Sequence, residues 1–342
     1  MKKLIAVILS LSMVIGLCAC GGGSKSSSAE YTADDPLVFR VSHVEATDSF
    51  LHKSCEKFKD YVEEKSEGKI KVEVYPNSEL GDYETSIEAV QSGTQQMTCA
   101  TTSALASYDP KLGLMDLPYL FESKEQMEAA VNGGEVEKLY TQWLEENGFY
   151  NGGIQYDGAR GLSNAKHEVK KPSDLKGLKI RVMQSDLYIK LFEAFGANPT
   201  PMSFSDLYTG LQQGTVDGQD NSPMLTYVNK FYEVQKYYST IDTVYAQCVM
   251  VCNKEFMESL PEDLKAIIDE GSAEYLVKYQ RENALAQEEE YLKDIKDAGL
   301  KVTEIKDKSE WKKAAQPVYD WMKKEVGEDY VQQMIDAANS TK

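Results

Sequence analysis

The sequence predicts an α/β fold with two lobes and a long helix that spans both of them. Strand-like and helix-like patterns alternate between residues 37 and 101, and a similar unit returns at about residue 178. A helical pattern of unusual length follows the second unit. A chain of 342 residues is also long enough for about two domains.

The composition is that of an ordinary globular protein with an acidic charge balance. Hydrophobic residues make up 42% of the chain, which is enough to bury a sizeable core. The chain has 37 basic and 55 acidic residues, and its formal net charge is −18. Because binding to phosphate backbones depends on clustered Lys and Arg, this balance argues against nucleic acid as a partner.

The first residues are typical of an export signal. Lys2 and Lys3 precede an apolar run over residues 4–17, which is too short to span a bilayer comfortably. The run ends in Leu-Cys-Ala-Cys before three glycines, and this ending resembles a bacterial lipobox in which Cys20 is lipidated. We therefore expect a lipoprotein signal peptide over residues 1–19. A plain secretory peptide is the alternative.

The segment after the signal predicts a tether. Residues 20–35 are rich in Gly, Ser and Ala, a composition typical of flexible linkers. Loss of residues 1–19 would remove two lysines and change the formal net charge from −18 to −20. We expect an extracytoplasmic protein that is held to the cell membrane by its lipid.

The first folded unit reads strand, helix, strand, helix, strand. The strands are expected over residues 37–41, 70–75 and 97–101, and the helices over residues 49–66 and 83–92. This order with short connections implies a parallel sheet covered by helices on both faces.

The second unit repeats part of this pattern. A strand over residues 178–182 is followed by helices over residues 186–195 and 205–213. The phrase Val-Gln-Ser-Gly-Thr at residues 90–94 is echoed by Leu-Gln-Gln-Gly-Thr at residues 211–215. Two copies of one helix ending suggest two lobes of one architecture, although glycine commonly ends helices and the echo could arise by chance.

The last third of the chain is mostly helical. Pro261 suits a first helical turn, and a helical pattern then runs to Ala298. A helix of this length, about 57 Å, would contact both lobes. The alternative is two shorter helices kinked near Gly271. A short strand over residues 300–305 and helices over residues 311–324 and 330–338 are expected to close the fold.

Four cysteines fall in the folded part. Cys248 and Cys252 share one face of a predicted strand, about 13 Å apart, which is too far for a disulfide between them. Buried free thiols are the favoured interpretation, and a metal site is not expected. The sequence leaves open whether any disulfide forms among Cys55, Cys99, Cys248 and Cys252.

A search for catalytic machinery is negative. The three histidines, His43, His52 and His167, form no HExxH pair, and there is no G-x-S-x-G, Walker or GxGxxG motif. The acidic run 288–290 is best explained as a solvated helix face. We therefore expect no catalytic residue, no cofactor and no enzyme activity.

Several stretches together resemble the DctP-type solute receptors of tripartite ATP-independent periplasmic (TRAP) transporters. They cover residues 76–81, 174–182, 196–202, 216–221 and 230–236. The resemblance implies a two-lobed fold of the periplasmic-binding-protein type, a Venus flytrap that closes around an organic acid. It also implies delivery of the acid to a membrane permease driven by an ion gradient.

The lobe boundaries follow from the same expectation. The first lobe would comprise residues 36–158 and 247–286. The second would comprise residues 159–246 and 287–342. We expect a monomer.

The resemblance also implies the site residues. Arg181 matches the family's central carboxylate-binding arginine, and the planar fork of a guanidinium suits that task. Arg160 matches a second ligand-facing arginine, although residues 161–164 depart from the usual Asn-Ile-Thr-Asn. Asn221 matches a ligand-binding asparagine, and Phe204 an aromatic that lines the cleft.

Four further residues are weaker candidates. His43, Thr101 and Tyr245 fall near strand ends that border the cleft in this family, and each could instead be structural. Asp82 is the weakest candidate.

The predicted function is thus a receptor for an organic acid. Uronates and other sugar acids are slightly favoured over C4-dicarboxylates. An ABC-type solute-binding lipoprotein is one alternative, and an exported enzyme with an unrecognised site is another.

Overall fold

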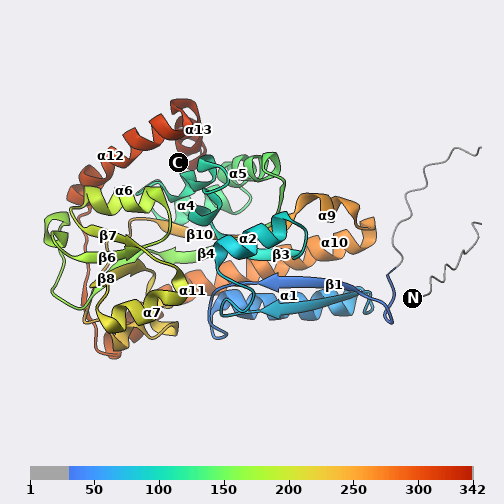
Figure 1. The fold of residues 1–342 in the computed structure, drawn as a ribbon. Coiled ribbons are helices and arrows are strands. Elements are labelled where there is room, and N and C mark those ends of the chain that lie inside the picture. Colours follow the sequence, from blue (N-terminus) through green and yellow to red (C-terminus); the bar gives the residue numbers. More distant parts are fainter. Residues whose placement is uncertain (1–30, 341–342) are drawn as a thin grey trace, which may run out of the picture.

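The computed structural model describes residues 31–340 of the chain. The predicted signal peptide, Cys20 and most of the tether lie outside the described residues. Two sheets form two lobes that lie side by side, and the long helix runs along the first lobe toward the second (Figure 1). Within residues 31–340, no helix is both long enough and apolar enough to cross a membrane.

The first lobe is built on a five-stranded sheet of order β2-β1-β3-β10-β4. Its strands are β1 (Leu37–Ser42), β2 (Ile70–Tyr75), β3 (Met97–Thr101), β4 (Phe149–Ala159) and β10 (Tyr245–Asn253). Strands β2 and β3 pair with β1 in parallel, as predicted. Strand β10 pairs antiparallel with both β3 and β4, so the complete sheet is mixed and not purely parallel.

The second lobe has a six-stranded sheet of order β11-β9-β5-β8-β6-β7. Its strands are β5 (Gly161–Asn164), β6 (Lys179–Val182), β7 (Asn198–Pro201), β8 (Gly218–Asn221), β9 (Tyr237–Ser239) and β11 (Lys301–Thr303). Strand β6 pairs in parallel with β7 and β8, and β8 pairs antiparallel with β5. Strands β7, β6, β8 and β5 therefore pair with one another in the same way as β2, β1, β3 and β10 of the first lobe.

Helices cover the sheets because their apolar positions fall on one face. In α1 (Phe50–Lys65) the buried side chains include Leu51, Cys55, Phe58 and Val62 at helical spacing. Ser49 caps this helix, and its Oγ accepts a hydrogen bond from the backbone N–H of His52 at 3.1 Å. The other early helices are α2 (Tyr83–Gln91), α3 (Thr102–Leu105), η1 (Pro110–Asp116), α4 (Lys124–Val131) and α5 (Glu135–Glu146).

The sequence echo marks equivalent positions in the two lobes. Helix α2 ends before β3, and α7 (Phe204–Gln213) ends before β8, the matching strand of the second sheet. Gly93 and Gly214 both adopt a left-handed conformation, with φ of 73° and 71°. The residue after each glycine, Thr94 or Thr215, donates its backbone N–H to the last helical turn. The interpretation of the echo as a repeated architecture is consistent with this topology.

The chain crosses between the lobes at two neighbouring places. Arg160 separates β4 from β5, and residues 240–244 connect β9 to β10. The two crossings are hydrogen bonded: Arg160 N donates to Val244 O at 2.9 Å, and Thr243 N donates to Arg160 O at 3.1 Å. These segments are the natural place for a hinge.

The long helix is continuous, but it is not α-helical throughout. It runs as α10 (Glu262–Gly271), a π-helical segment (Ser272–Tyr279) and α11 (Gln280–Asp297). The prediction of one helix over residues 261–298 therefore holds, and the feature at Gly271 is a widened segment and not a break. A side chain at Gly271 would lie 3.0 Å from the Tyr61 ring of α1, so glycine allows the close approach of the two helices.

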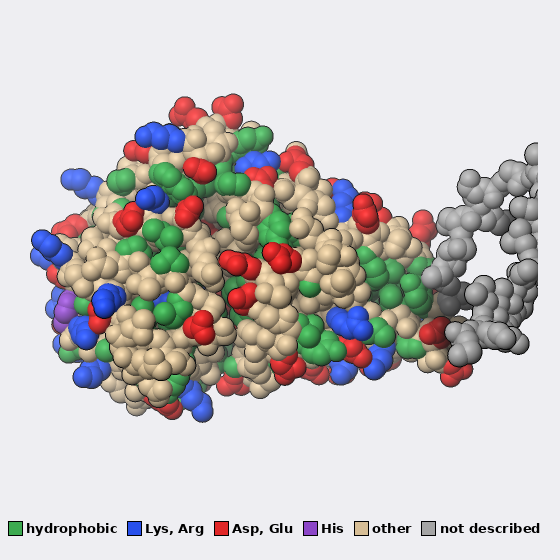
Figure 2. Space-filling view, in the orientation of Figure 1, with side chains coloured by type: hydrophobic (Ala, Val, Ile, Leu, Met, Phe, Trp, Pro, Cys, Tyr) green, Lys and Arg blue, Asp and Glu red, His purple; other side chains and the backbone are tan. Residues whose placement is uncertain are grey.

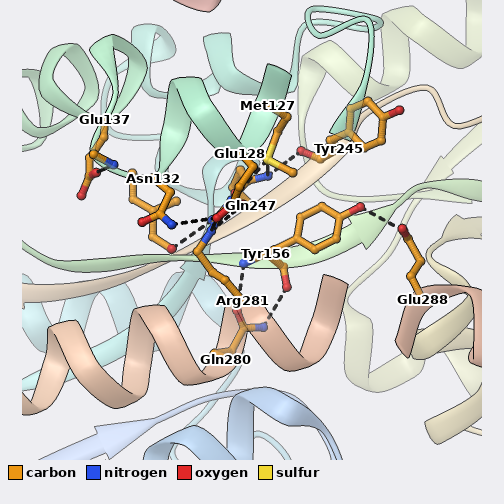
Figure 3. A network of polar contacts seen from close by, with 12 residues as sticks. Met127, Glu128, Asn132, Glu137, Tyr156, Tyr245, Gln247, Gln280, Arg281 and Glu288 are labelled. Carbon is orange, nitrogen blue, oxygen red and sulfur yellow. Dashed lines mark hydrogen bonds and ion pairs between the residues drawn. The ribbon is translucent and has the colours of Figure 1, made fainter. Parts of the chain in front are cut away.

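One end of α11 is fixed to the first lobe by polar contacts (Figure 3). Arg281 is 1% exposed, and its guanidinium donates to Glu128 of α4, to Gln247 of β10 and to the carbonyl of Ile154. Glu288 accepts hydrogen bonds from Tyr156 Oη and from Ala159 N. The prediction that residues 288–290 form a solvated face is therefore wrong for Glu288, which is buried.

The last two helices close the molecule. Helix α12 (Ser309–Val326) packs against α6 (Asp186–Ala194) of the second lobe, whereas α13 (Glu328–Asn339) packs against α4 and α5 of the first. The Tyr330 ring meets the Trp143 ring edge-on, with 6.0 Å between centroids. The expected assignment of residues 287–342 to the second lobe thus does not describe the packing of α13. The remaining short elements are η2 (Pro172–Leu175), α8 (Pro223–Val228), η3 (Phe231–Glu233) and α9 (Lys254–Ser259).

The four cysteines of the described chain are buried and free, as expected. Charge on the surface is dispersed: on the face shown in Figure 2, Lys and Arg are scattered and form no continuous patch. Acidic side chains lie along the middle of this face, where the lobes meet.

Candidate ligand-binding site

Two adjoining hollows lie between the lobes. The outer hollow has an empty volume of about 380 Å³ and the inner one about 280 Å³. Both lobes contribute to each of them. The residues that line both hollows are Tyr83 and Thr101 from the first lobe, and Arg181, Met183 and Phe204 from the second.

Arg181 is the cation at the centre of this region. It lies in β6 and is only 2% exposed, and its Nε donates to Met202 O at 2.9 Å. Nη1 has no hydrogen-bond partner among the described residues, and no described carboxylate lies within ion-pair distance of the guanidinium. Burial lowers the pKa of Arg181 to about 10, although the charge of Asp220 opposes this shift. At neutral pH Arg181 is therefore a buried cation without a carboxylate partner in residues 31–340.

Arg160 lines the inner hollow, but its charge is already balanced. Its Nε forms an ion pair with Asp220 at 2.7 Å, and both side chains are buried. Nη2 donates to the carbonyl of Asp220, and the guanidinium lies 5.2 Å from the centre of the Tyr188 ring. This network fixes Arg160 at the crossing between the lobes.

Two predicted residues flank Arg181 in the second lobe. Phe204 begins α7, and its ring centre is 6.0 Å from the Arg181 guanidinium carbon. Asn221 ends β8 and lines the inner hollow; its Nδ2 donates to Gln219 Oε1 at 2.6 Å. The ends of parallel strands are where open α/β sheets place ligand contacts.

Thr101 and Asp82 line the first-lobe side. Thr101 ends β3 and caps α3, with Oγ1 accepting from the N–H of Ala104 at 3.2 Å. Asp82 caps α2 and accepts from the N–H of Thr85 at 3.2 Å. Both side chains therefore have a structural task in addition to any contact with a ligand.

Two predicted residues do not line either hollow. His43 is buried and pairs with His52, with 3.1 Å between Nε2 and Nδ1. Burial, assisted by the neighbouring His52, lowers the pKa of His43 to about 3, so this imidazole is neutral. Tyr245 opens β10 and lines a separate pocket beside the crossing segment, together with Asp242 and Lys308.

The sequence prediction missed a pair of buried acids in the inner hollow, Glu45 and Asp157. Burial, together with the neighbouring Asp157, raises the pKa of Glu45 well above its usual range. Burial also raises the pKa of Asp157 to about 6, although the charge of Arg160 opposes this shift. At neutral pH we therefore treat the pair as one neutral and one ionised group.

The same pair supplies part of a candidate cation site. Ligand atoms of Glu45, Asp157 and Cys248 lie within 4.8 Å of one another. The Cys248 thiol has a strongly raised pKa because of its hydrogen bond to Cys99 and its burial, so a thiolate is disfavoured there. Because burial and Asp157 also disfavour the ionised form of Glu45, this set of donors does not fit a metal ion well.

The model of the DctP family, described as bacterial extracellular solute-binding protein, family 7, matches residues 41–325. This chain belongs to the DctP family.

Sequence relatives and solved structures agree with this assignment. The C4-dicarboxylate-binding periplasmic protein DctP of Rhodobacter capsulatus is 33% identical to this DctP-family chain, over 87% of the chain and 90% of the relative. The sugar acid binding protein DctPAm of Advenella mimigardefordensis, solved with galactonate, has a TM-score of 0.85 at 32% identity, covering 90% of this chain and 99% of that one. A TRAP solute-binding protein of Sulfurospirillum deleyianum, solved with succinate, has a TM-score of 0.82 at 29% identity, covering 87% and 98%.

These matches establish the class of the protein. It is a DctP-type, extracytoplasmic solute-binding protein of the TRAP class, with an α/β fold of two lobes, and not an enzyme. They also make the ABC-type alternative and the exported-enzyme alternative unnecessary.

Proposed function

We propose that this receptor binds an organic acid between its lobes, with Arg181 as the clamp for the carboxylate, and delivers it to a TRAP permease. One observation carries the proposal: Arg181 is buried between the lobes and no described carboxylate forms an ion pair with it. A buried charge without a counterion is costly, and a ligand carboxylate would supply the counterion. The planar guanidinium favours a bidentate contact.

The surrounding residues support the same assignment. Asn221 can donate to a carboxylate or accept from a hydroxyl group, and Phe204 provides an apolar wall. Related proteins were solved with galactonate and with succinate, so both hydroxylated and simple acids are candidates for this chain.

The proposal includes attachment to the membrane through a lipid on Cys20. The lipobox-like sequence and the Gly- and Ser-rich segment after it support this attachment. The folded receptor would then act as a monomer close to its permease. Fractionation of cells that express the full chain tests the location.

Replacing Arg181 tests the clamp. A thermal-shift screen of organic acids first identifies a ligand, and calorimetry then compares variants. Loss of one partner from a desolvated ion pair costs about 2–5 kcal/mol, so Arg181→Ala should weaken binding by roughly 30-fold to several thousand-fold. Arg181→Lys should recover only part of the loss, because an ammonium lacks the planar fork.

A matched control distinguishes this effect from a general loss of positive charge. Arg40 lies on β1, and its side chain is 41% exposed. Arg40→Ala should bind as the parent does. Binding by Arg181→Ala within threefold of the parent would show that Arg181 is not the carboxylate clamp.

A further inference from the structure

The inner hollow is lined by two acids, Glu45 and Asp157, as well as by two arginines. Arg160 is already paired with Asp220, which leaves Arg181 as the only unpaired cation among the described residues that line the hollow. Glu45 and Asp157 lie on the first-lobe side. Oε2 of Glu45 is buried and has no hydrogen-bond partner among the described residues. The site therefore has one position that favours a carboxylate, at Arg181, and a second position that disfavours further negative charge, at Glu45 and Asp157.

We propose that Glu45 and Asp157 form a hydroxyl-binding subsite that makes this receptor selective for polyhydroxylated monocarboxylates over dicarboxylates. The proposal rests on the proposed function, because it assumes that one carboxylate of the ligand meets Arg181. It narrows the ligand class to acids that carry several hydroxyl groups and a single charged end.

The chemistry of the pair suits hydroxyl groups. A protonated carboxyl group can donate one hydrogen bond and accept others, and an ionised one accepts only. A sugar hydroxyl can both donate and accept, so it can satisfy either partner. Because both acids are buried, these hydrogen bonds would form away from competing water.

The same pair excludes a second carboxylate. An anion placed next to Glu45 and Asp157 would add like charge in a desolvated region, where like-charge contacts are strongly unfavourable. No described lysine lines either hollow to compensate it. Selectivity would thus come from repulsion as well as from attraction.

Matched ligand pairs test the proposal. Galactonate and galactarate, gluconate and glucarate, and erythronate and meso-tartrate each differ only in whether the far end is a hydroxymethyl group or a carboxylate. Calorimetry on the full folded receptor should show at least one monocarboxylate bound about 30-fold or more tighter than its dicarboxylate. The proposal is overturned if no hydroxylated monocarboxylate binds, or if the dicarboxylate binds within threefold of its partner.

Amide variants then assign the selectivity to the acid pair. Glu45→Gln and Asp157→Asn keep the side-chain shape, and each removes one ionisable carboxyl group, so that the pair can carry less negative charge. Each should reduce the preference for the monocarboxylate about tenfold or more, with a parallel gain in dicarboxylate binding. Glu193→Gln, which alters a half-exposed acid on α6, should leave the preference unchanged. An unchanged preference in both amide variants would overturn the proposal.

The outcomes separate this inference from the proposed function. If dicarboxylates bind tightly and Arg181→Ala abolishes that binding, the clamp is supported and the hydroxyl subsite is rejected. If no acid in the panel or in the wider screen binds, both are rejected. Should one amide variant fail to fold, the preference of the parent protein and the other variant still decide the matter.

Discussion

Buried acids near the site should make the stability of the ligand-free protein depend on pH. Burial raises the pKa of Asp116 to about 7 and that of Asp157 to about 6. Between about pH 4 and pH 7 the folded state therefore binds more protons at these groups than the unfolded state does, and stability falls as pH rises. Burial also raises the pKa values of Glu45 and Asp242, which adds to this trend. Burial lowers the pKa values of His43 and His52, which opposes the trend below about pH 6.5.

Urea unfolding between pH 4.5 and pH 7.5 checks this expectation. The free energy of unfolding should decrease toward neutral pH, and Asp116→Asn should flatten the curve. The raised pKa of Asp116 should lower the free energy of unfolding at pH 7 by at most roughly 4 kcal/mol, relative to its value at low pH. A parent curve that rises steadily from pH 4.5 to pH 7.5 would contradict the expected decrease.

Among single residues, the sequence motifs predicted which side chains lie near the ligand site better than they predicted the contacts that those side chains make. Arg181, Arg160, Asn221 and Phe204 all line the inner hollow, because each lies in or next to the end of a strand or at the start of a helix. The sequence could not show that Arg160 is neutralised by Asp220, since Asp220 lies in β8, far along the chain from Arg160.

The acid pair was missed for a similar reason. Asp157 lies beside Arg160 in the sequence, and Glu45 lies shortly after the first strand, so a search of strand ends for acids could have found both. Their effect depends on burial and proximity, and neither is visible in one sequence. Tyr245 shows the reverse error, because it also lies at a strand end but lines a different pocket.

At the scale of elements, the polar contact between the long helix and the first lobe should contribute strongly to stability. The Arg281 guanidinium is buried and joins α11 to α4, β4 and β10 (Figure 3). Arg281→Ala leaves buried polar partners unsatisfied, and we expect it to lower the free energy of unfolding by about 3–5 kcal/mol.

A control on the same long helix is available. Lys278 forms an exposed ion pair with Glu274 at 3.0 Å, and Lys278→Ala should cost less than about 1 kcal/mol. Chemical denaturation of both variants measures the difference. Equal effects would mean that the network around Arg281 contributes little to stability.

The regular elements were largely predictable, because hydrophobic spacing sets them locally. The strands of the first unit, α1, α2 and α7 lie within a few residues of their expected positions. The π-helical segment Ser272–Tyr279 was not predicted, because the spacing of hydrophobic residues indicated a helix without showing that its turns widen there. The burial of Glu288 likewise depends on contacts with distant parts of the chain.

At the scale of the whole molecule, binding of an acid should favour the closed arrangement. Both lobes line the same small hollows, so the structure is closed around them. Closing without a ligand leaves Arg181 buried without a counterion, which favours opening about the two crossing segments. Small-angle scattering should give a smaller radius of gyration when a ligand found in the screen is added at saturation.

The same ligand concentration should leave the radius of gyration of Arg181→Ala unchanged. A parent protein with equal radii in both conditions would count against ligand-driven closure.

The strand order of the first sheet has a consequence for how the chain folds. Strand β10 lies between β3 and β4, yet it consists of residues 245–253, which follow most of the second lobe in the sequence. The ribosome therefore synthesises β10 after most of the second lobe. A growing chain that stops before residue 245 leaves β3 and β4 without the strand that joins them. Such distant pairing slows folding, because a long loop must close before the contacts can form. The first lobe is therefore first in the sequence, but it cannot be completed before much of the second.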